Sequence, residues 1–237
     1  MPSAKQKLQI NESKASRFDF DLIADSYDNW YAGRQGAMYD RLEKKAIIRY
    51  LPPHAKGEKL LEVGCGTGHW SRFFSGYGFE VTGVDVSQRM IDIAKSKNIS
   101  DASFQVADGH SLPFADETFD VTAAVTTLEF VRDAEVLLRE MMRCTRKSGR
   151  ILLGVLNGLA KVNRQRVNSP ESPYSAARLF SPIELKEFLE PFGWVEITVG
   201  GFVPAQSWLI PFAPWFDCIG GVIGSQKGAF IAAVLKL

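Results

Sequence analysis

Short, largely apolar runs alternate with amphipathic stretches between residues 58 and 156. Such runs predict strands, and apolar positions that recur every three or four residues predict helices. Regular alternation of the two is typical of a parallel sheet with helices on both faces. The expected strands lie at 59–63, 80–84, 103–107, 119–125 and 150–156, with helices in 70–77, after Ser87 and at 133–146.

The chain before this alternation predicts a tail and two helices. Residues 1–16 are polar and lack a sustained apolar period, so we expect a flexible tail. Apolar residues recur at helical spacing from Phe20 to Tyr27, and 39–50 gives a second helical pattern that ends before two prolines. We expect these helices, within 17–51, to cap the core.

The chain after residue 156 predicts an insertion, a helix and two strands. Segment 157–180 is polar, lacks a clear period and is too long for a simple connection, so we expect a lid or a substrate-binding insertion. In 181–237, Ser181 and Glu184 form a capping-box pattern at the start of a helix. The last two strands are expected at 195–203 and 229–235.

The composition narrows the class of protein. The chain has 237 residues, of which 46% are hydrophobic and 23% charged, and its formal net charge is +1. These values are typical of a globular chain, and without a basic tract we expect no nucleic-acid partner. No run of about 18 apolar residues predicts a transmembrane segment. Cys65, Cys144 and Cys218 are too widely spaced for a disulfide framework or a zinc site, so we expect no metal and a cytoplasmic setting.

Three glycines in 60–68 lie where a predicted strand turns into a helix. Backbone amides that lack neighbouring Cβ atoms can face a ligand there, although such triplets also occur in ordinary tight turns. Dinucleotide sites space their second and third glycines three apart, whereas Gly66 and Gly68 are two apart. The loop therefore predicts a nucleotide-type ligand and disfavours a nicotinamide-dependent oxidoreductase.

Acidic residues follow the next two predicted strands. Asp85 lies 21 residues after Gly64, where a carboxylate can accept hydrogen bonds from both ribose hydroxyls. Asp108 follows the third strand, where it can meet an adenine amino group. Such acids suit a ligand with hydroxyls, an amino group and cationic character, and they would repel a pyrophosphate.

Together these motifs make residues 58–156 resemble the class I S-adenosylmethionine-dependent methyltransferases, and they are most similar to the small-molecule branch that includes quinone-biosynthesis enzymes. The resemblance implies a single domain over 17–237 with a Rossmann-like α/β three-layer sandwich. Its seven-stranded sheet is mostly parallel, and the last strand is antiparallel beside the fifth. The implied activity is methyl transfer from S-adenosylmethionine, which leaves S-adenosylhomocysteine. The matching segments are the glycine loop, 83–87, Asp108 with 112–114, 119–121 and 147–150.

The resemblance also implies the cofactor site. The glycines let the methionine moiety approach, Asp85 holds the ribose, Asp108 meets the adenine, and Tyr27 caps the cofactor. Where many relatives carry a leucine-histidine-histidine sequence, this chain has a glutamate, Glu129, so no histidine role transfers. The residues expected to bind the cofactor are Tyr27, Glu62, Gly64, Cys65, Gly66, Gly68, Asp85, Val86, Met90, Asp108, Gly109 and Thr127.

The chemistry leaves the general base open. A sulfonium methyl is already activated, so alignment and exclusion of water are the main tasks. A base helps only when the acceptor is an oxygen or a protonated nitrogen. His110, Glu129 and Tyr27 are the candidates, with a solvent-facing loop histidine, a structural acid and core filling as the respective alternatives.

The acceptor is expected to be a small molecule. Aromatic residues gather near the C-terminus, and they are compatible with an apolar acceptor pocket, a dimer interface, a membrane-surface contact or core packing. A hydrophobic acceptor would suit the first of these. A monomer and a homodimer are both compatible with the sequence, and the alternative function is a non-catalytic cofactor-binding regulator. The aromatic residues are Trp208, Phe212, Trp215 and Phe216.

Overall fold

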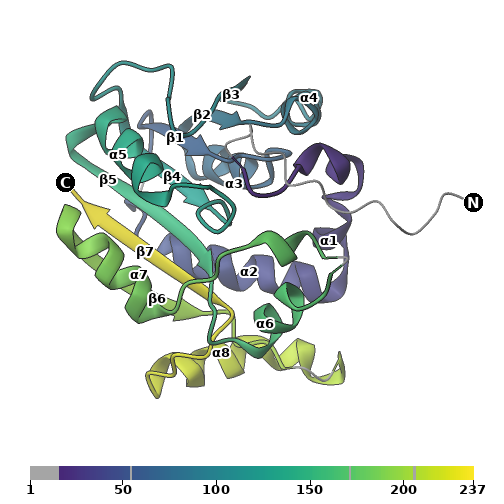
Figure 1. The fold of residues 1–237 in the computed structure, drawn as a ribbon. Helices are drawn as coiled ribbons and strands as arrows, with labels where there is room; N and C mark the ends of the chain where they lie inside the picture. Colours follow the sequence, from purple (N-terminus) through teal and green to yellow (C-terminus); the bar gives the residue numbers. More distant parts are fainter. Residues whose placement is uncertain (1–15, 54, 171, 205–206) are drawn as a thin grey trace, which may run out of the picture.

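The fold centres on one seven-stranded sheet, seen in a computed structural model that describes residues 16–53, 55–170, 172–204 and 207–237 (Figure 1). Its strand order is β3-β2-β1-β4-β5-β7-β6. The first five strands pair in parallel, and β7 lies antiparallel between β5 and β6, which confirms the expected sheet. The strands are β1 (Lys59–Val63), β2 (Glu80–Asp85), β3 (Ala102–Val106), β4 (Phe119–Val125), β5 (Thr145–Leu156), β6 (Trp194–Gly200) and β7 (Phe230–Lys236).

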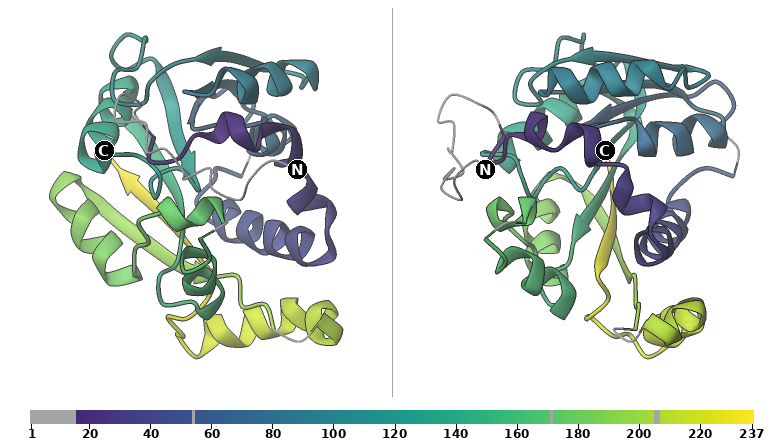
Figure 2. Two further views of the ribbon diagram at one scale, coloured as in Figure 1. Left: turned by 45° about the vertical axis from the view of Figure 1, so that its right-hand side comes forward. Right: turned by 90° about the vertical axis from the view of Figure 1, so that its right-hand side faces the viewer.

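Helices cover both faces of the sheet (Figures 1 and 2). Successive residues of a strand point to opposite faces, so neighbouring leucines serve two different cores. Leu61 packs in the core that α5 and α7 cover, while Leu60 packs in the core that α2 and α3 cover. The helices are α1 (Asn29–Ala32), α2 (Arg34–Ile48), α3 (His69–Tyr77), α4 (Gln88–Ser96), α5 (Ala134–Cys144), α6 (Lys161–Val167), α7 (Pro182–Leu189) and α8 (Ala213–Val222).

Polar side chains cap the helices that carry the core. The Ser87 hydroxyl accepts a hydrogen bond from the Met90 amide at the start of α4. Ser181 and Glu184 form the capping box that the sequence predicts at the start of α7. The local sequence therefore determines where these helices begin.

The N-terminal segment differs from the prediction. The segment expected to form a helix contains two 3-10 turns, η1 (Phe20–Leu22) and η2 (Ala24–Ser26). Ile23, between the turns, has a φ of −121°, which no α-helix contains. The second helix begins at Arg34 rather than at residue 39. Of the expected tail, residues 1–15 lie outside the described residues, and Ser16 forms an isolated bridge with Val131.

The segment after residue 156, whose sequence lacks a clear apolar period, nevertheless forms regular structure. That segment contains α6 and a 3-10 turn, η3 (Pro173–Ala176). The buried side of α6 is polar: Asn163 donates hydrogen bonds to the backbone carbonyls of Asn157 and Ala229. A helix held in this way shows no apolar stripe in its sequence.

The aromatic C-terminal residues lie at the surface, which rules out core packing for most of them. Trp208, Phe212 and Trp215 are 71%, 55% and 63% exposed, on the turn η5 (Ser207–Phe212) and on α8. Within the described residues, no helix is long and apolar enough to cross a membrane.

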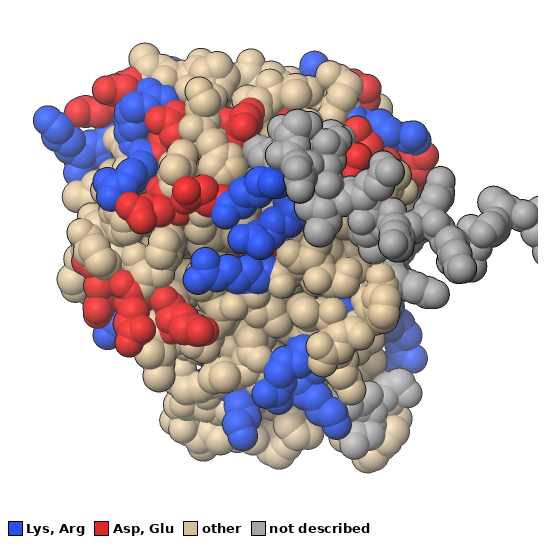
Figure 3. Space-filling model, in the orientation of Figure 1, with Lys and Arg blue, Asp and Glu red and all other residues tan. Residues whose placement is uncertain are grey.

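On the face drawn in Figure 3, acidic and basic side chains are interspersed over the upper half.

Candidate functional site

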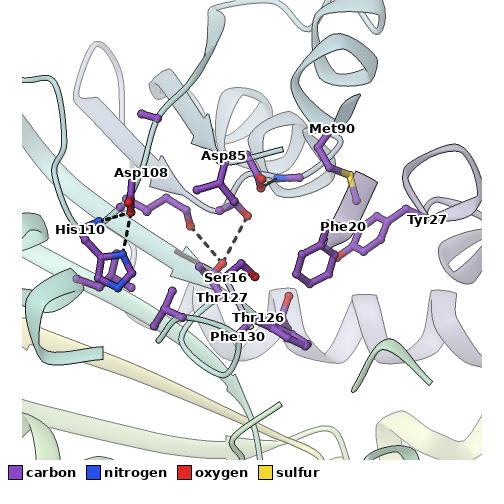
Figure 4. A pocket seen from close by; sticks show the side chains of 18 residues that line it. Ser16, Phe20, Tyr27, Asp85, Met90, Asp108, His110, Thr126, Thr127 and Phe130 are labelled. Atoms are coloured by element: carbon purple, nitrogen blue, oxygen red, sulfur yellow. Dashed lines mark hydrogen bonds and ion pairs between the residues drawn. The ribbon is translucent and has the colours of Figure 1, made fainter. Parts of the chain in front are cut away.

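A cavity lies at the carboxyl ends of β1 to β4, where the strand order reverses between β1 and β4. In doubly wound sheets this reversal opens a crevice that binds ligands. The cavity holds about 630 Å³ of empty space, part of it open to solvent. Residues from all four strand ends and from the N-terminal turns line it (Figure 4).

The glycine loop forms one wall of this cavity in a left-handed backbone conformation. Gly64 and Gly66 have φ values of +73° and +51°, in the left-handed region that favours glycine. A Cβ atom on Gly64 would lie 2.3 Å from Oγ1 of Thr127. The Thr127 hydroxyl in turn donates to the Val63 carbonyl at 3.2 Å. The loop and the segment after β4 are therefore packed too closely for any side chain at residue 64.

Asp85 holds the loop from the end of β2. Its Oδ2 accepts from the Gly66 amide and its Oδ1 from the Ser87 amide, both at 2.9 Å. Burial raises the pKa of Asp85, and the two amide hydrogen bonds oppose that rise. A carboxylate has about four lone-pair positions, so acceptor capacity remains on the side that faces the cavity.

Asp108 and His110 form a pair at the end of the cavity that lies farthest from Tyr27 (Figure 4). Asp108 Oδ1 lies 2.7 Å from Nδ1 of His110, and the Asp133 amide donates to its Nε2 at 3.3 Å. A backbone amide can only donate, so Nε2 is unprotonated and Nδ1 carries the hydrogen. Both ring nitrogens are occupied, which disfavours His110 as a general base.

Nine of the twelve residues expected to bind the cofactor line the cavity, and three do not. Cys65 packs in a small apolar cluster that includes Phe104. A Cβ atom on Gly68 would meet side chains of α4 and β3, so this glycine serves helix packing. Glu62 is buried and accepts from the Ser71 hydroxyl at 2.5 Å. The nine lining residues are Tyr27, Gly64, Gly66, Asp85, Val86, Met90, Asp108, Gly109 and Thr127.

Glu129 and Tyr27, the other two candidates for a general base, are also poorly suited to that role. Glu129 lies outside the cavity lining, and its Oε1 accepts from the Leu156 amide. Burial raises the pKa of Glu129 to about 7, and its Oε2 has no hydrogen-bond partner among the described residues. Burial also raises the pKa of Tyr27 well above its ordinary value, so its hydroxyl stays neutral.

The structure adds lining residues that sequence reasoning missed. Phe20 and Phe130 meet edge to face with ring centroids 5.0 Å apart, and both line the cavity. Thr126 has a φ of +50°, a conformation rarely adopted by a β-branched residue. Ser16 and Val131 complete this side. No sequence signal marks them, because only the fold brings the N-terminal turns against the segment after β4.

Glu62 gives a pH-dependent prediction about stability. Burial, with Asp85 adding to it, raises the pKa of Glu62 from 4.5 to about 8, against the hydrogen bond from Ser71. The folded protein thus binds this proton more tightly than the unfolded chain does. Its stabilising effect is complete below pH 4.5 and is lost as the pH rises through about 8.

The glutamine in Glu62→Gln cannot ionise, so this variant does not lose stability by this route as the pH rises. The difference in the free energy of unfolding, variant minus wild type, should therefore rise by about 1 kcal/mol or more between pH 5 and pH 8.5. Urea denaturation at several pH values measures this difference. Glu80→Gln, at an exposed position of β2, is the control and should show no such trend. A constant difference between Glu62→Gln and wild type at all pH values would contradict the assignment.

The sheet and the cavity at its topological switch point define a doubly wound α/β protein, and comparison with known proteins agrees with this class. The family described as "Methyltransferase domain" matches residues 61–153. An O-methyltransferase of Penicillium expansum is 32% identical over 214 residues, covering 83% of this chain and 73% of the relative. The 2-methyl-6-phytyl-1,4-hydroquinone methyltransferase of Synechocystis sp. is 34% identical over 190 residues, covering 74% and 57% of the two chains.

Solved structures show the same fold. An S-adenosylmethionine-dependent methyltransferase of Thermotoga maritima superposes with a TM-score of 0.72 at 24% identity, covering 92% of this chain and 97% of that one. The chain belongs to the class I S-adenosylmethionine-dependent methyltransferases. S-adenosylmethionine is the cofactor of this family.

Proposed function

We propose that the cavity at the carboxyl ends of β1 to β4 binds S-adenosylmethionine and that the protein transfers its methyl group to a small-molecule acceptor. The observation that carries the proposal is the convergence of the glycine loop, Asp85 and Asp108 on one cavity. Gly64 and Asp108 lie 44 residues apart in the chain, and the three features belong to three different strand ends.

The lining supports a specific orientation of the cofactor. Asp85 directs its remaining acceptor capacity to the ribose hydroxyls. Asp108 accepts from the adenine amino group, with Val86 and Met90 as apolar neighbours. At Gly66 a Cβ atom would lie 3.8 Å from Cε1 of Tyr27, which also lines the cavity, so glycine keeps this space open for the methionine moiety.

Methyl transfer needs alignment more than acid–base groups. The acceptor's lone pair forms a bond to the methyl carbon while the bond between that carbon and sulfur breaks. The electron pair of the broken bond stays on sulfur. Phe20, Tyr27 and Phe130 support the proposal because their rings shield one side of the cavity from water. In this proposal 17–51 caps the cofactor and 157–180 acts as a lid, in a cytoplasmic enzyme.

The names of relatives support a small-molecule acceptor. One relative acts on a hydroquinone and another is a demethylmenaquinone methyltransferase. The alternative, a cofactor-binding regulator on the same fold, predicts binding without transfer.

Isothermal titration calorimetry tests the binding half of the proposal. S-adenosylmethionine and S-adenosylhomocysteine should both bind with micromolar affinity, and NADH should give no binding heat. Absence of binding with both adenosyl ligands would contradict the proposal. Release of S-adenosylhomocysteine that depends on an added acceptor then separates an enzyme from a regulator.

A further inference from the structure

A second cavity adjoins the proposed cofactor cavity, and Tyr27 and Thr126 line both. It holds about 840 Å³ of empty space, part of it open to solvent. Its walls come from η2, α1, α2, the end of β5, α6 and η3. A molecule in this second cavity would therefore lie directly beside the cofactor.

Four of the eleven residues that line the second cavity are aromatic: Tyr27, Trp30, Tyr31 and Tyr174. The side chains of Ile23 and Leu156 add aliphatic surface to the same lining. Burial raises the pKa of Tyr31 and of Tyr174, so both phenols stay neutral. Flat ring faces of this kind suit a planar ligand body.

Arg166 brings a positive charge into this aromatic setting, and no carboxylate of the described residues forms an ion pair with it. Its guanidinium carbon lies 4.5 Å from the ring centroid of Trp30 and 5.3 Å from that of Tyr174. Its one hydrogen bond to a described residue is a long one, 3.4 Å to Oδ1 of Asn163. A half-buried guanidinium held by ring faces, with most of its donors unused, is well suited to bind an anionic oxygen group through two parallel hydrogen bonds.

Glu43 supplies the complementary group from α2. It lines the same cavity, and its carboxyl group has no hydrogen bond or ion pair with another described residue. Burial raises the pKa of Glu43 to about 7, with Asp40 adding to the rise and the charge of Arg166 opposing it. Arg166 and Glu43 thus interact electrostatically across the cavity, but their side chains do not form an ion pair. A ligand that carries two polar groups would satisfy both.

We propose that this second cavity is the acceptor site, and that it selects a planar, mostly apolar acid whose anionic group binds Arg166 and whose hydroxyl or amine donates to Glu43. This inference rests on the proposed function, because it assigns the substrate class of the same enzyme. It also explains why the cap and lid segments each contribute one charged side chain to the cavity.

Binding of small phenolic acids to the protein saturated with S-adenosylhomocysteine tests the inference by calorimetry. The probes are 4-hydroxybenzoate and 4-hydroxyphenylacetate, each with its neutral alcohol counterpart, and benzoate, which lacks the hydroxyl. At least one hydroxy acid should bind about tenfold more tightly than its neutral counterpart and than benzoate.

Two variants test which side chain is responsible for each binding preference. Arg166→Gln should remove the advantage of the acid over the alcohol, whereas Arg164→Gln, exposed on the same helix, should keep it. Glu43→Leu should remove the advantage of the hydroxy acid over benzoate. Each variant should keep wild-type affinity for S-adenosylhomocysteine, which shows that it is folded.

The outcomes separate the two proposals. If S-adenosylhomocysteine itself fails to bind, the proposed function is wrong. If it binds but no hydroxy acid does, or if the neutral alcohols bind equally well, the assignment of the acceptor class is wrong. The same holds if the preference for the acid survives in Arg166→Gln.

Discussion

Asp85→Ala is expected to weaken S-adenosylmethionine binding by about 100-fold. Hydrogen bonds to a charged group each contribute about 1.5–3 kcal/mol, and every 1.4 kcal/mol corresponds to about a tenfold change in affinity. The substitution removes the acceptor for the ribose hydroxyls. It also releases the Gly66 and Ser87 amides that shape the loop and the first turn of α4. Calorimetric titration of both proteins measures the loss.

Asp92→Ala is the matched control for this prediction. Asp92 is an exposed carboxylate on α4 that accepts from the Gln88 side chain and lies outside the cavity lining. This variant should bind S-adenosylmethionine as wild type does. Wild-type affinity in Asp85→Ala would show that the carboxylate does not contact the cofactor.

Gly64→Ala is expected to lower the affinity for S-adenosylmethionine by about tenfold or more, because a one-to-two kcal/mol backbone penalty is joined by a steric clash. The new Cβ atom would lie 2.3 Å from Oγ1 and 2.5 Å from Cγ2 of Thr127. Relief requires the loop or the segment after β4 to move, and both line the cavity. The same titration measures the affinity.

Gly57→Ala isolates the backbone contribution. Gly57 has a φ of +80°, and a Cβ atom there would meet no atom within 4 Å. Its substitution should therefore cost about 1–2 kcal/mol in the free energy of unfolding and leave cofactor binding unchanged. Equal affinities for Gly64→Ala and Gly57→Ala would contradict the idea that close packing at Gly64 shapes the site.

The strands can be predicted well from the sequence because their buried positions are mostly occupied by apolar residues. Strands β1 and β4 begin and end at the predicted residues, since both are covered on two faces and nearly all of their residues are buried. The prediction of secondary structure fails where contacts with distant parts of the chain determine the backbone conformation. Segment 20–27 has helical spacing of apolar residues, yet Phe20 packs against Phe18 and Phe130 while the backbone forms two short turns.

The proposed cofactor site could be predicted better than the acceptor site. Gly64, Asp85 and Asp108 follow consecutive strands, so parallel topology alone places them at one edge of the sheet. Glu43 and Arg166, by contrast, lie on α2 and α6, more than 100 residues apart in the chain. Each looks like an ordinary charged residue of a surface helix, and only the folded structure brings them to one cavity.

The measurement that tests the central claim most directly follows the methyl group itself. The protein is incubated with S-adenosylmethionine labelled in its methyl group and with a cell metabolite extract. The proposed function predicts label in the small-molecule fraction, an equal amount of S-adenosylhomocysteine, and loss of both in Asp85→Ala. Binding of S-adenosylmethionine with no transfer from any extract, or label found only in protein or nucleic acid, would contradict it.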